Sequence, residues 1–326
     1  MKIDRRTVLF AAAASLCTTI APFAYAAEEW PSRTVKIISP YGAGGPNDVS
    51  ARLISEALGK RLGQTFIVEN KSGAGTLVAN QLVATSPGDG YTILYAAAPY
   101  STLEALKGKL SYNPRKDLKA VAMAITVPLF LIVNADSPFH TVQDLIKYGK
   151  SHDGGLTFGS PGSGSLPHLA VELLLRDADV NGIAVHYRGD VAAYTDLLAG
   201  RLDATLTAIT AARPHIEAGK LRVLGVASSS RSEIYPEAPT LKEQGLPNVV
   251  ASGWYGFMAP AATPVKIIDR LSAEIIDVLN DPAIKSKLLS QGMETMPENP
   301  AGFTTFIDSE MKKWGAVIKD ANIKTE

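Results

Sequence analysis

The chain has 326 residues, of which 46% are apolar, and its 32 lysines and arginines equal its 32 aspartates and glutamates. A chain of this length and composition can bury a core in one large or two medium domains, so wholesale disorder is not expected. The balanced charge offers nothing to attract a polyanion, so nucleic acid is not an expected partner.

The first 26 residues have the three parts of a secretory signal peptide. A basic start up to Arg6 precedes a mostly apolar stretch, and Ala24-Tyr-Ala26 supplies small residues two apart. We predict cleavage after Ala26 and export to the periplasm, through either a Sec or a twin-arginine signal because Arg5 and Arg6 are adjacent. The apolar stretch is short and interrupted, which disfavours a membrane anchor, and no later run has the length of a membrane span.

Cys17 lies inside this segment and is the sole cysteine of the chain. The mature chain is therefore expected to form no disulfide, no cysteine–metal site and no cysteine nucleophile. A chain without thiols tolerates an oxidising compartment.

From residue 35 onward, short apolar runs alternate with amphipathic stretches, which predicts an α/β fold with mostly parallel sheets. A strand at 35–39 leads into a helix whose apolar face includes Val49, Leu53 and Ala57. Further strands are expected at 65–69 and 91–95, with a glycine-containing loop at 71–76 before another helix.

An apolar run at 126–133 is expected to carry the chain into a second lobe, with strands at 156–159, 183–187, 204–209 and 221–227. Residues 249–258 are predicted to carry the chain back from lobe 2 to lobe 1, and after Pro264 the pattern is helical to the end. We predict two lobes joined by two crossovers, each lobe a mixed, mostly parallel sheet flanked by helices. Lobe 1 comprises residues 27–125 and 253–326, and lobe 2 comprises residues 126–252.

Three segments rich in glycine or serine, at 40–47, 71–76 and 160–167, each follow a predicted strand and precede a predicted helix. Ligands of α/β sheets bind outside the carboxyl ends of strands. Free amides at helix N-termini favour negative charge. Three such loops facing one cleft could hold an anion without any lysine or arginine.

Motifs for catalysis are missing. Asn47 occupies the third glycine position of a dinucleotide-binding loop, no stretch matches a phosphate-binding P-loop, and no serine lies between glycines two residues away on each side. The five histidines show no metal-binding spacing. We therefore predict no enzyme, no cofactor and no metal, with a cleft hydrolase as the weak alternative because catalytic triads are spatial.

Several sequence segments between Trp30 and Trp314, in the same order along the chain, resemble the substrate-binding proteins of tripartite tricarboxylate transporters, the TctC or Bug receptor family. The matching pieces are Pro40-Tyr-Gly-Ala-Gly-Gly-Pro-Asn-Asp48, Val68-Glu-Asn-Lys-Ser-Gly-Ala-Gly75, Pro87-Gly-Asp-Gly-Tyr-Thr92, Ser160-Pro-Gly-Ser-Gly-Ser-Leu-Pro-His-Leu169, Tyr187-Arg-Gly189 with Asp196-Leu-Leu198, Gly219-Lys-Leu-Arg-Val-Leu-Gly-Val226 and Gly253-Trp-Tyr-Gly256.

The resemblance implies a two-lobed periplasmic binding protein of the type II-like class that closes on a small organic acid. It would work as a monomer and deliver its ligand to the membrane subunits of a tripartite transporter. A receptor that presents its ligand to a membrane sensor kinase stays open as an alternative, because both roles need the same closed lobes.

The resemblance also implies the ligand-binding residues. In lobe 1 these are Tyr41, Gly42, Ala43, Gly44, Gly45 and Asn47, with Gly75 and Thr76 nearby. In lobe 2 they are Ser160, Gly162, Ser163, Gly164, Ser165 and Arg188. A bulky residue at Gly44 is expected to block binding, and Ser163→Ala to weaken it.

This chain departs from the family pattern in two places. Gly42 and Ala43 stand where two prolines are usual, and Arg188 replaces a lysine and is followed by Gly189 and Asp190. Both changes leave the identity of the ligand open. Among the neighbours of these loops, Asp48 is expected to bind loop amides, His168 to be a structural hydrogen-bond partner, and Trp254 to pack at the crossover.

Overall fold

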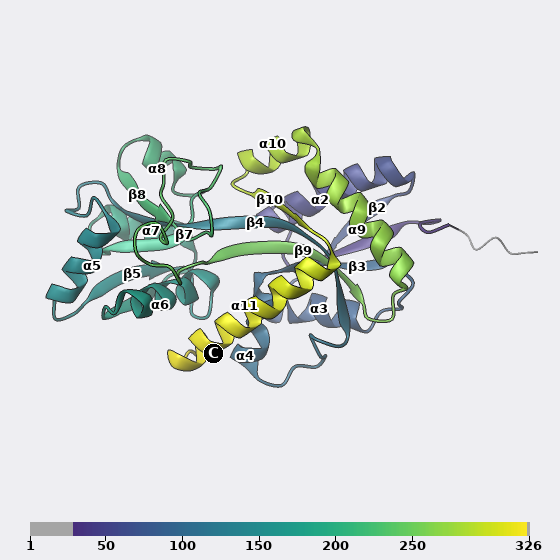
Figure 1. Cartoon of the computed structure of the whole chain (residues 1–326), viewed down its shortest axis with the longest axis horizontal. Helices are drawn as coiled ribbons and strands as arrows, with labels where there is room; N and C mark the ends of the chain where they lie inside the picture. The colour runs from purple at the N-terminus through teal and green to yellow at the C-terminus, as the bar shows by residue number, and fades with distance from the viewer. Residues whose placement is uncertain (1–28, 325–326) are drawn as a thin grey trace, which may run out of the picture.

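The computed structural model describes residues 29–324, so the expected signal peptide lies outside the described residues. Two lobes lie side by side, and the long strands β4 (Leu118–Asn134) and β9 (Ser252–Pro260) run between them (Figure 1). The strand order is β2-β1-β3-β9-β4-β7-β5-β6, and β8 and β10 also pair with β4. The predicted two-lobed α/β architecture with two crossovers is confirmed.

Lobe 1 is built on β1 (Val35–Ser39), β2 (Phe66–Asn70) and β3 (Thr92–Ala97), which are parallel, with β9 antiparallel to β3. Apolar residues point to both faces of this sheet, as expected for a strand covered by helices on both sides. One face packs against α2 (Pro46–Leu62) and α9 (Val265–Asn280). The other packs against α3 (Leu77–Ala84) and α11 (Pro300–Asp320). The short helical segments η1 (Ala74–Thr76), η2 (Ala98–Ser101) and α4 (Leu103–Lys107) complete this lobe.

Lobe 2 contains β5 (Leu156–Ser160), which is parallel to both β6 (Gly182–His186) and β7 (Ala204–Ala208). The second half of β4 pairs antiparallel with β7 and with β8 (Leu221–Val226). The helices of this lobe are α5 (Val142–Ser151), α6 (Leu166–Ala178), α7 (Asp190–Leu198) and α8 (Arg213–Glu217). α5 and α6 cover one face of the sheet, while α7 and α8 cover the other.

Strand β4 changes partner where it leaves lobe 1. It pairs with β9 as far as Pro128, opposite Ser252, and from Leu129 onward it pairs with β7. Because β4 changes partner at this point and β9 begins opposite it, few strand-pairing hydrogen bonds resist bending there. The lobe limits expected from the sequence, at 125/126 and 252/253, lie within a few residues of this partner change. We keep these limits as a proposed division of the chain.

One sequence prediction for the C-terminal region is wrong. The chain is not helical throughout after Pro264, because α9 and α10 (Pro282–Ser290) are followed by strand β10 (Glu294–Glu298), which pairs antiparallel with β4. The segment Glu-Thr-Met-Pro-Glu has no apolar alternation, so its extended form is set by the backbone of β4. The apolar spacing of Val265, Ile268 and Leu271 predicts one buried stripe, but Val265, the first residue of α9, is 65% exposed.

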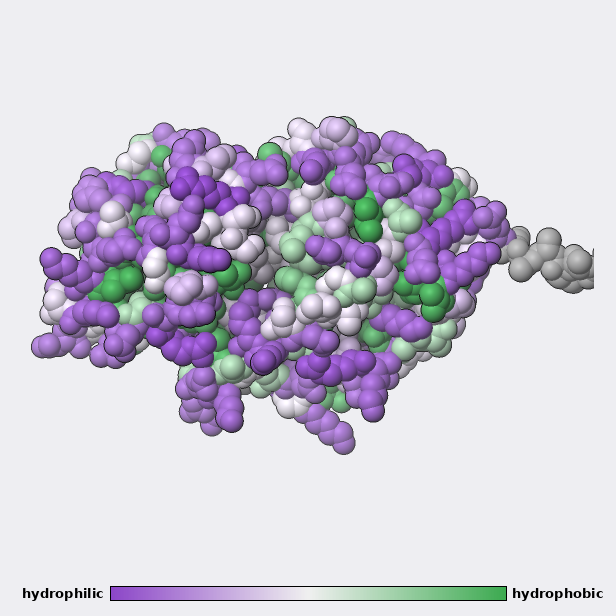
Figure 2. Space-filling model, viewed as in Figure 1, coloured by the Kyte–Doolittle hydropathy of each residue, from purple (hydrophilic) through white to green (hydrophobic). Residues whose placement is uncertain are grey.

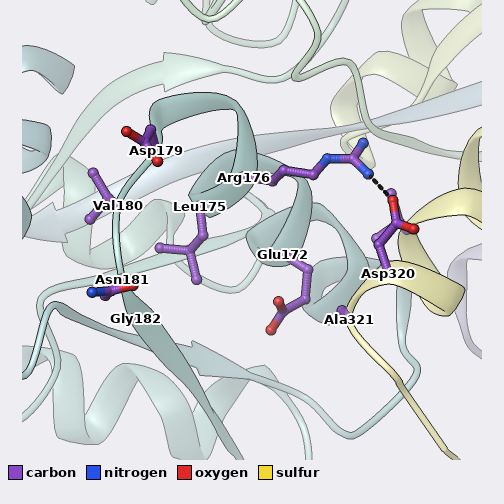
Figure 3. A pocket seen from close by; sticks show the side chains of 10 residues that line it. Glu172, Leu175, Arg176, Asp179, Val180, Asn181, Gly182, Asp320 and Ala321 are labelled. Carbon is purple, nitrogen blue, oxygen red and sulfur yellow. Dashed lines mark hydrogen bonds and ion pairs between the residues drawn. The ribbon is translucent and has the colours of Figure 1, made fainter.

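Helix α11 contacts both lobes and is a third connection between them (Figure 1). Its first half contributes Phe303 to a core cluster of lobe 1, and its second half contributes Trp314 to the core of lobe 2. Near its end, the Asp320 carboxylate binds Arg176 of α6 at 2.9 Å. This ion pair bridges a hollow of about 370 Å³ along the seam between the two helices (Figure 3).

Polar residues cover most of the face shown in Figure 2, and paler, less polar surface appears where the two lobes meet. No helix within residues 29–324 combines the length and the apolar character that crossing a membrane requires.

Candidate functional site

The loop between β1 and α2 presents backbone amides that the protein leaves free. Residues 41–44 are exposed, and within the described chain no acceptor binds the amide nitrogens of Gly42, Ala43 or Gly45. Gly45 caps α2 without a side-chain hydrogen bond, and Pro46 at the first helical position has no N–H. The positive end of the α2 dipole therefore faces this bare loop.

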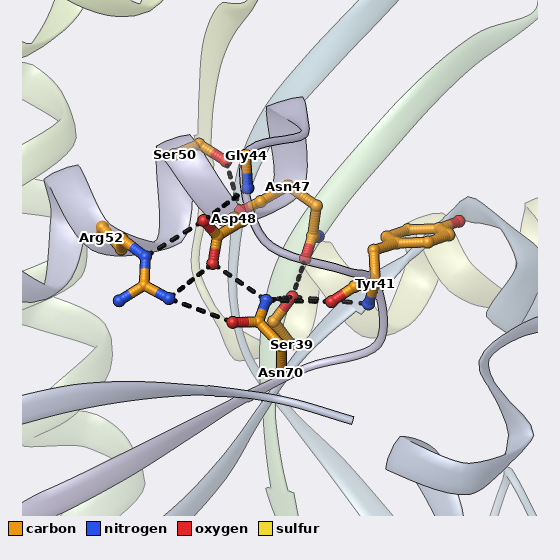
Figure 4. A network of polar contacts seen from close by, with 8 residues as sticks. All are labelled: Ser39, Tyr41, Gly44, Asn47, Asp48, Ser50, Arg52 and Asn70. Atoms are coloured by element: carbon orange, nitrogen blue, oxygen red, sulfur yellow. Dashed lines mark hydrogen bonds and ion pairs between the residues drawn. The ribbon is translucent and has the colours of Figure 1, made fainter. Parts of the chain in front are cut away.

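A polar network beneath the loop fixes its base (Figure 4). The Asp48 carboxylate accepts hydrogen bonds from the Gly44 amide at 3.0 Å and from Arg52 Nε at 3.1 Å. The side-chain amide of Asn70 bridges the ends of β1 and β2, donating to Asp48 Oδ1 and to the Tyr41 carbonyl, each at 2.9 Å. Asp48 binds a loop amide as predicted.

Asn47 lies under the same loop with half of its amide satisfied. Its Oδ1 accepts a hydrogen bond from Ser39 Oγ at 2.7 Å. The residue is 1% exposed, and its Nδ2 has no partner among the described residues. An unsatisfied buried donor is costly, so an acceptor that reaches this position gains affinity.

Asp48 should make stability pH-dependent. Its hydrogen bond to Arg52, followed by those to Gly44 and Asn70, lowers its pKa to about 2. Because the pKa is lower in the folded chain, this stabilisation is complete above about pH 4 and is lost as pH falls toward 2. We expect Asp48→Asn to reduce the free energy of unfolding by about 1–2 kcal/mol at pH 7.

Urea unfolding of both proteins at pH 7, 4 and 2.5 checks this prediction. The difference between them should shrink as the pH falls, and a constant difference would contradict the assignment. Glu56→Gln, on the exposed face of the same helix, is the control and should change little, because Glu56 and Lys60 are both more than half exposed.

The second bare loop, before α3, has a strained backbone. Ala74, Gly75 and Thr76 all have positive φ, of 48°, 66° and 86°. This region is costly for a β-branched residue such as Thr76. Gly75 is exposed, whereas Thr76 is 2% exposed and its Oγ1 accepts a hydrogen bond from Asn80. The Thr76 side chain is therefore used inside the protein, and of these two predicted residues only Gly75 lies at the surface.

In lobe 2, the loop between β5 and α6 satisfies more of its own groups than the first loop does. Ser165 caps α6 and also donates to the Gly162 carbonyl at 2.7 Å. Ser160 is fully buried at the base of the loop. Ser163 is exposed at the tip, and its amide has no acceptor within residues 29–324. Among the residues of this loop, Ser163 is therefore the one most accessible to a ligand.

His168 accepts a hydrogen bond from one of the backbone amides expected to bind the ligand. The Gly164 N–H donates to His168 Nδ1 at 2.9 Å, which places the proton of the neutral ring on Nε2, 3.5 Å from Glu172. The structural assignment of His168 is confirmed, and the Gly164 amide is not free. Because Nδ1 is occupied by this amide and Nε2 faces Glu172, neither nitrogen serves as the general base for a serine of this loop.

A second loop of lobe 2, between β6 and α7, runs from Tyr187 to the start of α7. Tyr187 donates to Asp196 at 2.7 Å, which anchors the start of the loop. Arg188 is exposed. Asp190 is half-buried, and its Oδ1 accepts a hydrogen bond from Thr207 Oγ1 of β7 at 2.8 Å. Burial raises the pKa of Asp190, and the Thr207 hydrogen bond offsets part of this effect.

Two aromatic residues lie near the lobe 1 loop. Burial raises the pKa of Tyr41 to about 12, although 37% of the residue is exposed. Burial, and then the nearby Tyr41, raises the pKa of Tyr255. Trp254 is fully buried and packs edge-on against Phe303, as predicted for crossover packing.

Packing brings the loop between β5 and α6 of lobe 2 toward lobe 1. Leu166, directly after this loop, packs against the lobe 1 cluster that includes Ile38, next to the end of β1, and Ala98, directly after β3. Ser163 Oγ lies 3.5 Å from the carbonyl of Lys324 beyond α11. The carboxyl end of β5 is thus held on the side of lobe 1 where β1 and β3 end. Within residues 29–324, no three His, Asp or Glu side chains gather closely enough to hold a metal ion.

Sequence reasoning missed three residues that shape these loops. Asn70 and Arg52 hold the Asp48 network, and Thr207 holds Asp190. Asn70 ends a strand beside a glycine-rich loop, which is a usable signal. Nothing in the local sequence links Thr207 to a residue 17 positions earlier.

Comparison with known proteins adds an independent line of evidence. The family profile described as "Tripartite tricarboxylate transporter family receptor" matches residues 50–323. The chain is 35% identical to the protein of the tcbD-tcbE intergenic region of a Pseudomonas species, covering 97% of this chain and 94% of that one. It is 34% identical to protein BugT of Bordetella pertussis, covering 91% and 92%.

Solved structures are similar over about nine tenths of this chain. A TctC solute binding protein from Polaromonas has a TM-score of 0.81 at 26% identity, covering 89% of this chain and 99% of that one. An R. palustris protein solved with adipate has a TM-score of 0.75 at 31% identity, with 91% and 99% covered. MatC from Rhodopseudomonas palustris, solved with malate, has a TM-score of 0.70 at 31% identity, with 89% and 100% covered.

Proposed function

This chain belongs to the tripartite tricarboxylate transporter receptor family and is a solute-binding protein rather than an enzyme, and from that premise we propose that it captures a small organic carboxylate between its lobes. Two structural neighbours were solved with carboxylates, adipate and malate. The expected class of ligand is therefore a small mono- or dicarboxylate.

The observation that carries this proposal is the bare loop at the N-terminus of α2. The amides of Gly42, Ala43 and Gly45 have no acceptor in the described chain, and Asn47 Nδ2 lies unsatisfied beneath them. A carboxylate has two oxygens that each accept hydrogen bonds from such donors, and each charge-assisted bond contributes about 1.5–3 kcal/mol. The binding residues stay those predicted, except that Thr76 and the amides of Gly44 and Gly164 have partners inside the protein.

Closure of the lobes would complete the site. β4 changes partner from β9 to β7 between Pro128 and Leu129, and β9 begins opposite Pro128 at Ser252, so bending at this point costs fewest hydrogen bonds. Bending there brings Ser163 and Arg188 of lobe 2 toward the first loop and excludes water from the acid, which strengthens each hydrogen bond.

The proposed setting of this protein is the periplasm beside a membrane transporter. We place it in the periplasm, as a monomer that presents the closed, ligand-bound form to the membrane subunits of a tripartite transporter. The closed form alone would carry the ligand-dependent shape that such subunits recognise, since a ligand can shift an equilibrium only toward the state it binds better.

A thermal-shift screen tests the carboxylate assignment. We expect one or more small organic acids to raise the melting temperature of protein freed of ligand by unfolding and refolding, because a ligand that binds only the folded form stabilises it by about 2.7 kcal/mol at a hundred times its Kd. The corresponding methyl esters serve as the control and should have no effect. Equal stabilisation by acid and ester, or by neither, would count against the proposal.

A further inference from the structure

We propose that the ligand carries a hydrogen-bond donor, a hydroxyl or ammonium group, beside its carboxylate, and that Asp190 of lobe 2 is the residue that selects it. This inference rests on the proposed function, because it assumes that a carboxylate is held by the first loop. It assigns to Asp190 a role in specificity within the same cleft.

The position of Asp190 places its carboxylate at the side of lobe 2 that faces lobe 1. It is the first residue of α7, directly after Gly189, whose φ of +97° turns the chain at the carboxyl end of β6. Its partner Thr207 lies one residue before the end of β7 and pairs with Phe130 of β4. Phe130 is two residues beyond Pro128, where β4 leaves its lobe 1 partner.

The carboxylate of Asp190 is only partly satisfied. Thr207 Oγ1 binds Oδ1, and no donor binds Oδ2 within the part of the chain that the structure describes. Tyr194 lies near Asp190, because the Asp190 charge is the second cause, after burial, that raises the pKa of Tyr194. The Tyr194 hydroxyl does not serve Asp190, since it donates to the Ala208 carbonyl at 3.1 Å. Water can serve this oxygen while the cleft is open, and when the lobes close and exclude water a donor on the ligand must take its place. The raised pKa of Asp190, caused by burial, fits this shortage of partners.

A plain carboxylic acid cannot supply that donor. At neutral pH its carboxylates only accept hydrogen bonds, and a second carboxylate close to Asp190 would be repelled. A hydroxyl or ammonium group on the ligand would donate to the free oxygen, and an ammonium would also be attracted by the charge. Asp190 therefore favours 2-hydroxy or 2-amino acids over unsubstituted acids of the same length.

Calorimetry with matched acids tests the inference. The probes are succinate, malate and aspartate, and then adipate with 2-aminoadipate, each titrated into protein freed of ligand. We expect wild-type protein to bind a substituted acid at least tenfold more tightly than the unsubstituted acid of equal length. Asp190→Ala should reduce that preference to less than threefold, mainly by weakening the substituted acids.

Asp190→Asn separates the two kinds of donor, because its amide oxygen accepts a hydrogen bond but carries no charge. If the ligand is a hydroxy acid, this variant should keep most of the preference, and if it is an amino acid, the preference should fall at least tenfold. Asp153→Ala is the matched control, since Asp153 is an exposed aspartate of the same lobe that follows α5. It should bind every acid as wild type does.

The outcomes distinguish this inference from the proposed function. If unsubstituted acids bind wild type as tightly as substituted ones, or if the preference survives in Asp190→Ala, the role of Asp190 is wrong while the carboxylate assignment stands. If no acid of either series binds the wild-type protein, the carboxylate assignment fails and the inference falls with it. Unchanged melting temperatures of the free variants exclude misfolding as the cause.

Discussion

Replacing Trp314 by alanine is expected to lower the free energy of unfolding by about 3–5 kcal/mol, the usual cost of removing a buried tryptophan. Trp314 has no exposed surface, although it lies on a helix that begins in lobe 1, and it packs in the core of lobe 2. Its Nε1 donates to Glu310 Oε2 at 2.7 Å, and Glu310 is itself buried. The substitution therefore leaves a cavity and an unsatisfied carboxylate oxygen together.

Urea unfolding monitored by circular dichroism measures the effect, and two variants on the same helix interpret it. Lys312→Ala removes an exposed side chain and should stay within about 0.5 kcal/mol of wild type. Trp314→Phe keeps most of the packing but loses the N–H, so it should fall between the other two. A loss of less than 1 kcal/mol in Trp314→Ala would mean that α11 does not dock on lobe 2 in solution.

This docking is the part of the fold that the sequence predicted least well. The apolar spacing of Phe303, Ile307, Trp314 and Ile318 predicts a helix with one buried face. It does not say that the two halves of that face enter different cores. The same limit explains β10, because the extended form of Glu294–Glu298 comes from pairing with β4 and not from its own residues. Strands followed by glycine-rich loops, such as β1 and β5, were predictable because apolar runs and loop residues are local signals.

In the candidate site, the sequence predicted which loops matter better than which groups in them are free. The exposure of Gly42 and Ser163 follows from bare loops at strand ends. The pairing of the Gly164 amide with His168 depends on the first turn of α6, and the burial of Thr76 depends on Asn80 one helical turn later. Such partners are fixed by side-chain geometry, which residue spacing alone does not determine.

Replacing Gly44 by valine is expected to weaken binding of the acid found in the screen at least a hundredfold. Gly44 has a φ of +88°, a conformation that costs a β-branched residue about 1–3 kcal/mol. A Cβ at this position would meet no atom within 4 Å, so the strain comes from the backbone and not from a clash. The loop would relieve it by turning, which redirects the amides of Ala43 and Gly45 and breaks the bond from the Gly44 N–H to Asp48.

Calorimetry with the same acid measures the loss, and Gly42→Ala is the matched control. Gly42 lies in the same exposed loop, its φ is not in the left-handed region, and a Cβ there also has open space. Because alanine keeps the N–H, Gly42→Ala should bind within threefold of wild type. The free energy of unfolding of Gly44→Val should fall by no more than about 3 kcal/mol, since the loop is exposed. A Gly44→Val protein that binds the acid normally would show that the amides of this loop do not hold the carboxylate.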